Sequence, residues 1–190
     1  MKIDGKDTRS IWVESGGKSV GIIDQTLLPH RFATRSLTTL ADAAHAIKSM
    51  QVRGAPLIGA TAAYGIWLAL REAASDEALE RAYGVLIATR PTAINLKWAL
   101  DEMTASVRNR PRAERAAAAL ARANEIAEED IAINQAIGCH GLKLIEAIAA
   151  SISSSAHFRL IAVGRVAASV AQARSRFSSE ASVSSASQTP

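Results

Sequence analysis

The 190-residue sequence contains one cysteine, Cys139, and aromatic residues make up only 4% of it. A single cysteine excludes an internal disulfide and a zinc site built from paired cysteines. The longest apolar run, APLIGATAAYGIWLAL, is shorter than the ~20 residues that a transmembrane helix needs. The polar start, MKIDGKDTRS, predicts no secretory signal. We therefore expect a cytoplasmic protein with no membrane partner.

Dense blocks of one charge are also lacking, because the net charge is only +4 and lysine and arginine are scattered along the chain. This pattern argues against a nucleic-acid partner and is compatible with a small anionic substrate. Apolar residues make up 48% of the sequence, which is enough for a core. Much of that fraction is alanine, and alanine-rich cores are typical of closely packed helices.

The first strands are predicted within residues 10–29. SIWVE and SVGIIDQTLLP have apolar residues at alternating positions and flank the turn SGGKS, which is typical of a β-hairpin. Pro29 is expected to end the second strand. Helical patterns then fill residues 39–150, so the predicted fold class is α+β: a small antiparallel hairpin or sheet followed by a helical bundle.

The helix starts can be predicted from capping residues. Thr39 and Asp42 form a capping-box pattern, and the next helix is expected from about Pro56 to Ala73. Ser75 is expected to cap a third helix, and Thr92 a fourth. The fourth helix carries apolar residues at helical spacing: Leu96, Leu100, Met103 and Val107.

A fifth, alanine-rich helix is expected to begin at Pro111, a residue that suits the first helical position. Gly138 and Gly141 are expected to separate it from a short last helix. Residues 151–190 are rich in Ser, Ala and Arg, and Glu180 is the only acidic residue after Glu146. We expect this tail to be partly disordered.

The best candidate for a binding site is RGAP, residues 53–56, at the start of the second predicted helix. A helix start presents unpaired N–H groups and partial positive charge. Gly54 lets the backbone approach a ligand, and the guanidinium of Arg53 suits phosphate oxygens. This combination predicts an anion site, with phosphate as its natural occupant. The alternative is a surface arginine beside a turn glycine.

A second arginine, Arg90, stands beside Pro91 at the start of the fourth predicted helix. If the two helices are neighbours, Arg53 and Arg90 can face one cleft. The alternative is that Arg90 only interacts with the C-terminal dipole of the helix before it.

Other reactive residues are weaker candidates. Asp24 is expected to hydrogen-bond within a turn, and residues 128–130 read as a solvated acidic face of a helix. Cys139 needs an activating neighbour to act as a nucleophile, and the adjacent His140 would point elsewhere on a helix. No cluster has metal-ligand spacing, including around His30 and His45, so no metal is expected.

Four segments in order resemble the methylthioribose-1-phosphate isomerase family: IDQTLLP, MQVRGAPLIGATAAYGIWLAL, TRPTAINLKWAL and EEDIAINQAIGCHGLKLI. The resemblance covers residues 1 to about 148. The same superfamily includes ribose-1,5-bisphosphate isomerases and regulatory subunits of a translation-initiation exchange factor.

This resemblance implies an aldose–ketose isomerisation of 5-methylthioribose 1-phosphate, in methionine salvage, by a homodimer without metal or organic cofactor. It assigns substrate binding to Arg53, Gly54, Ala55 and Arg90. It also implies that residues 1–150 form the N-terminal domain and that a Rossmann-like α/β domain is missing.

The resemblance also implies that the family's catalytic cysteine and aspartate lie in that missing part, and no cysteine or aspartate follows residue 150 in this sequence. We therefore expect no catalytic residue in this chain and no activity from it alone. Our hypothesis for residues 151–190 is an out-of-frame or unrelated extension. The alternatives are a regulatory module that senses a sugar phosphate or nucleotide, and a product without function.

Overall fold

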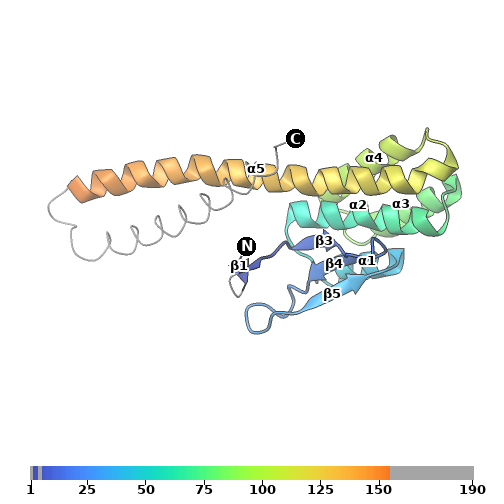
Figure 1. Ribbon diagram of the computed structural model, residues 1–190, viewed down its shortest axis with the longest axis horizontal. Coiled ribbons are helices and arrows are strands. Elements are labelled where there is room, and N and C mark those ends of the chain that lie inside the picture. The colour runs from blue at the N-terminus through green and yellow to red at the C-terminus, as the bar shows by residue number, and fades with distance from the viewer. Residues whose placement is uncertain (1, 4–5, 155–190) are drawn as a thin grey trace. The chain divides into compact units, whose positions relative to one another are not determined.

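The computed structural model describes residues 2–3 and 6–154 of the chain (Figure 1). Contacts divide the chain into two units, Met1–Asp130 and Ile131–Pro190, and the division falls within the last helix. The first unit contains the strands and the helical bundle. In the second unit, the described part is the helix up to Ser154. The predicted tail lies outside the described residues from position 155 onward.

The strands form two small antiparallel sheets. Short strands β1 (Lys2–Ile3) and β2 (Lys6–Asp7) pair with each other. Strands β3 (Ile11–Val13), β4 (Val20–Ile23) and β5 (Thr34–Leu37) form a second sheet in the order β3-β4-β5. The predicted hairpin is therefore confirmed as β3 and β4.

Two details of the strand prediction were wrong. The second strand ends at Ile23 and does not reach Pro29, because the carboxylate of Asp24 forms a turn with Thr26. The third strand, β5, was not predicted, since three of its four residues are exposed and show no alternation.

The middle strand, β4, is buried along its whole length. On one face, the indole of Trp12 covers Gly21 so closely that a Cβ at Gly21 would lie 2.3 Å from a ring carbon. On the other face, Val20 and Ile22 belong to the core that the sheet shares with the helices. The sheet is thus the outer layer of one hydrophobic core.

Helix α2 (Ala55–Glu72) is the centre of the bundle, and every residue from Ile58 to Leu70 is buried. Helices α1 (Leu40–Lys48), α3 (Asp76–Ile87) and α4 (Ile94–Val107) all pack against it (Figure 1). Glycine allows the close approach: a Cβ on Gly65 would lie 3.2 Å from the Cβ of Ala43 on α1. The expected core of closely packed helices is confirmed.

Two of the three predicted side-chain caps are present. Thr39 and Asp42 form the capping box of α1, and the Ser75 hydroxyl accepts a hydrogen bond from the Ala78 N–H at the start of α3. The Thr92 cap was wrong, because Ala93 occupies the N-cap of α4 and forms no side-chain cap. The predicted apolar positions of α4 are confirmed as fully buried: Leu96, Leu100, Met103 and Val107.

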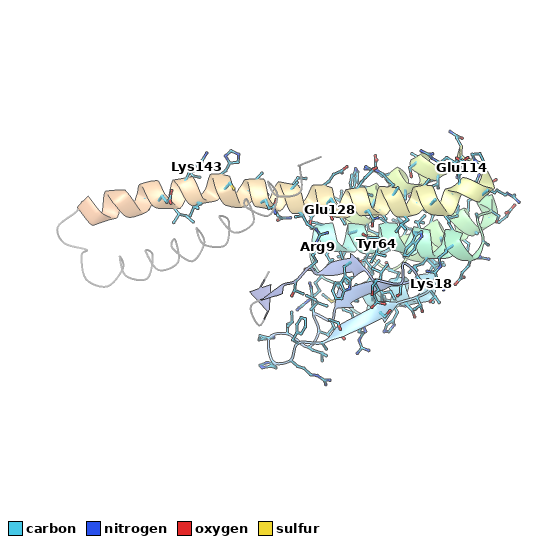
Figure 2. All side chains as sticks on the ribbon, viewed as in Figure 1. Arg9, Lys18, Tyr64, Glu114, Glu128 and Lys143 are labelled. Atoms are coloured by element: carbon cyan, nitrogen blue, oxygen red, sulfur yellow. The ribbon has the colours of Figure 1, made fainter. Side chains whose placement is uncertain are left out.

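Helix α5 (Arg112–Ser154) begins one residue after Pro111 and continues through Gly138 and Gly141. The predicted division at those glycines was wrong, because an isolated glycine costs a helix only about 1 kcal/mol. In the first unit, α5 is tied to α2 by a hydrogen bond of 2.9 Å from the Tyr64 hydroxyl to Asn124 Oδ1. Nearby, Arg9 forms an ion pair with Glu128 (Figure 2).

These elements make an α+β fold, as the sequence predicts, with a small antiparallel sheet on a helical bundle. The loops that follow β4, α1 and α3 carry the candidate site.

Candidate functional site

The RGAP segment forms the turn into α2, as predicted. Gly54 is the N-cap of α2 and has a positive φ of 97°, a conformation that favours glycine. A Cβ built on Gly54 meets nothing within 4 Å, and no side chain caps the first turn. Residues 53–56 are exposed. The first backbone amides of α2 are therefore open to a ligand, which is what an anion site requires.

The side chain of Arg53 is held by a residue far away in the sequence. Its Nη2 donates a hydrogen bond of 2.7 Å to the backbone oxygen of Gln25, which follows β4. The Arg53 backbone N–H donates to Gln25 Oε1 at 3.0 Å. Within the described part of the chain, no other partner of this guanidinium occurs, so most of its donors face solvent.

Asp24 has a structural role, as the sequence predicts. Its carboxylate is buried and accepts from the Thr26 N–H and hydroxyl and from Arg35 Nε, the last at 2.6 Å. Burial by itself raises the pKa of Asp24, but the hydrogen bonds from Thr26 and Arg35 outweigh burial and hold the pKa below its ordinary value. Asp24 is therefore an ionised anchor for the loop that carries Gln25.

Arg90 lies in the loop between α3 and α4, four residues before the first residue of α4. The starts of α2 and α4 contact each other, because a Cβ on Gly59 would lie 3.1 Å from the backbone oxygen of Asn95. Gly59 is the fifth residue of α2, and Asn95 is the second residue of α4. The loops of Arg53 and Arg90 therefore enter their helices beside the same helix–helix contact.

The remaining candidate residues do not form a site. His30 and His45 are exposed, and within the described ranges no group of His, Cys, Asp or Glu side chains can hold a metal ion. Cys139 and His140 lie in the second unit and are also exposed. No described helix is long and apolar enough to cross a bilayer.

A cavity of about 280 Å³ lies elsewhere, between α3 and α4. Its lining comes from Leu79, Glu80, Tyr83, Gly84, Thr104 and Arg108. Neither arginine loop contributes to it. We place the candidate site at the arginine loops because they combine open helix amides with guanidinium groups, whereas the cavity has no such convergence of donors.

Gln25 is the residue that sequence reasoning missed. It stands 28 residues before Arg53, and no periodicity connects the two positions. The only signal was its place in IDQT, directly after the end of a strand.

Comparisons with known proteins agree with this arrangement of elements. The chain is 61% identical over 147 residues to a methylthioribose-1-phosphate isomerase of Paramagnetospirillum magneticum, a match that covers 77% of this chain and 41% of that protein. A crystal structure of 5-methylthioribose 1-phosphate isomerase from Pyrococcus horikoshii matches with a TM-score of 0.67 and 37% identity, covering 73% of this chain and 41% of that one.

A second solved structure, the translation initiation factor eIF-2B subunit delta of A. fulgidus, matches with a TM-score of 0.66 and 34% identity, covering 73% of this chain and 42% of that one. This chain thus spans about 41% of the length of the isomerases it resembles. The profile of the Initiation factor 2 subunit family matches residues 51–184, which is more than half of the sequence. The chain belongs to the Initiation factor 2 subunit family.

Proposed function

We propose that this chain supplies the phosphate-binding part of an aldose–ketose isomerase that converts 5-methylthioribose 1-phosphate to 5-methylthioribulose 1-phosphate in methionine salvage. The observation that carries the proposal is the contact between the starts of α2 and α4, each preceded by an arginine. The similarity to methylthioribose-1-phosphate isomerases supports the choice of substrate.

In this proposal, Arg53 and Arg90 donate charge-assisted hydrogen bonds to the phosphate oxygens. The backbone amides at Gly54 and Ala55 add neutral donors at the positive end of α2. Binding a phosphate remote from the reacting carbons holds the sugar in place for reaction. These four residues therefore bind and orient the substrate, and they need no metal or organic cofactor to do so.

The isomerisation itself moves hydrogen between C1 and C2 and needs an acid and a base. Arginine cannot serve, because it stays protonated. The carboxylate of Asp24, which precedes Gln25, is buried and already accepts hydrogen bonds from Thr26 and Arg35. We propose that the chain alone binds the sugar phosphate without turning it over. We further propose that it works in the cytoplasm as a homodimer, as the resemblance implies.

A second candidate function is a regulatory module that senses a sugar phosphate or nucleotide. The similarity to the translation initiation factor subunit favours it, since that structure matches about as well as the isomerase. In this case the same arginine loops bind the phosphate, and no turnover is expected under any condition.

Calorimetric titration with 5-methylthioribose 1-phosphate tests the binding site. Arg53→Ala and Arg90→Ala are each expected to weaken binding about tenfold or more, the loss expected for a charge-assisted hydrogen bond. Arg81→Ala, at an exposed position of α3, is the matched control and should bind normally. Unchanged affinity in both site variants would refute the proposed site. A coupled isomerase assay tests the expected lack of turnover, and tighter binding of a nucleotide than of the sugar phosphate would favour the regulatory function.

A further inference from the structure

Gln25 forms three hydrogen bonds with the loop that leads into α2. Its N–H donates to the backbone oxygen of Gln51 at 2.9 Å. Its Oε1 accepts from the Arg53 N–H at 3.0 Å, and its backbone oxygen accepts from Arg53 Nη2 at 2.7 Å. One residue therefore fixes both the backbone and the side chain of Arg53.

Arg53 needs such a partner because its side chain is exposed. A free arginine side chain loses rotamer entropy when a ligand immobilises it. The hydrogen bond from Nη2 to the backbone oxygen of Gln25 positions one nitrogen of the guanidinium before a ligand binds. Four of the five N–H donors then stay available for phosphate oxygens.

Gln25 is itself part of an anchored turn. The Asp24 N–H donates to the backbone oxygen of Ala33 at 2.9 Å, and the buried Asp24 carboxylate binds Thr26 and Arg35. These contacts hold the turn that carries Gln25 in place independently of the loop that carries Arg53. Because the turn is fixed, the hydrogen bonds of Gln25 restrict where Arg53 can lie.

We propose that Gln25 is a positioning residue of the sugar-phosphate site, which orders the loop of residues 51–53 and holds the Arg53 guanidinium ready for the phosphate. This role rests on the proposed function. Gln25 does not touch the substrate and acts through Arg53.

The test combines Gln25→Met, which keeps the length of the side chain and removes its acceptor, with Arg53→Ala in the full chain. Titration with 5-methylthioribose 1-phosphate should show about a fivefold loss of affinity for Gln25→Met, the value expected for one hydrogen bond. In the Arg53→Ala background the same substitution still removes the acceptor of the backbone N–H at position 53, but no guanidinium is left to be positioned, so the loss of affinity should be clearly smaller. Gln51→Met is the matched control, since Gln51 contacts Gln25 through its backbone oxygen, which this substitution keeps.

Amide hydrogen exchange of the unliganded chain gives a second readout. Gln25→Met should speed the exchange of the Arg53 amide, and Gln25→Glu, which keeps the acceptor oxygen, should restore protection. Two results would overturn the role of Gln25 while leaving the site intact. One is an equal loss of affinity for Gln25→Met in the unsubstituted chain and in the Arg53→Ala background. The other is an unchanged exchange rate of the Arg53 amide in Gln25→Met. Failure of the unsubstituted chain to bind the sugar phosphate would instead refute the proposed function, and with it the positioning role toward that ligand.

Discussion

Arg115 should be among the most important charged residues for the stability of this fold. It lies in the first turns of α5, and its side chain is only 6% exposed. Its guanidinium donates to three backbone oxygens, at 3.1 Å to Arg110, 2.8 Å to Arg108 and 3.3 Å to Ala74. It thereby joins the end of α4, the turn after α2 and the start of α5.

The expected cost of Arg115→Ala follows from these contacts. Hydrogen bonds that involve a charged group contribute about 1.5–3 kcal/mol each. The contact at 3.3 Å is long and contributes least. We expect the free energy of unfolding to fall by about 3–4 kcal/mol, a large part of the stability of an ordinary domain.

The ion pair of Arg115 with Asp76 is expected to matter less. Its atoms are 2.8 Å apart, but the Asp76 side chain is 57% exposed. Exposed pairs contribute about 0–1 kcal/mol. Asp76→Asn, which keeps all three backbone contacts of Arg115, is therefore the matched control and should cost less than about 1 kcal/mol.

Urea unfolding followed by circular dichroism measures both variants. Equal slopes of the unfolding free energy against urea would show that the midpoints report stability alone. A loss in Arg115→Ala no larger than the loss in Asp76→Asn would refute the reasoning, because it would mean that the backbone contacts add nothing.

Two other predictions concern the core. Leu100→Ala should lower the free energy of unfolding by about 2–5 kcal/mol, because Leu100 is fully buried. Trp98→Ala, on the exposed side of α4, should cost far less. Equal losses of the two variants in urea unfolding would contradict the packing of α4. The pKa of Tyr64 is raised to about 12, mainly by burial and also by the charge of Glu128. Absorbance at the phenolate band should therefore show Tyr64 ionising near pH 12, and titration at the ordinary value in the folded chain would contradict its burial. Since the folded pKa lies above the unfolded one, stability from Tyr64 is complete below about pH 10 and is lost as the pH rises toward 12.

The features that the sequence predicts correctly are local ones. The Thr39 capping box, the Ser75 cap and the apolar spacing of α4 each depend on residues within a few positions of one another. The predicted helix start near Pro56 belongs to the same class, because it depends on a proline beside the first residue of α2, Ala55.

The features that were missed depend on distant partners. Strand β5 exists because β4 offers it a paired edge, and its own exposed residues carry no strand pattern. Glycines 138 and 141 do not end α5, although such residues often end helices. The contacts of Gln25 with Arg53 and of Arg115 with Ala74 join residues that lie 28 and 41 positions apart in the sequence. Only the folded arrangement reveals them.

The central claim is that Arg53 and Arg90 bind one phosphate between the starts of α2 and α4. A crystal structure of the chain with 5-methylthioribose 1-phosphate tests this claim most directly. We predict guanidinium nitrogens of both arginines about 2.7–3.0 Å from oxygens of the same phosphate, with the Arg53 bond to Gln25 retained. A phosphate bound elsewhere, or arginine side chains pointing to opposite sides of the bundle, would contradict the account.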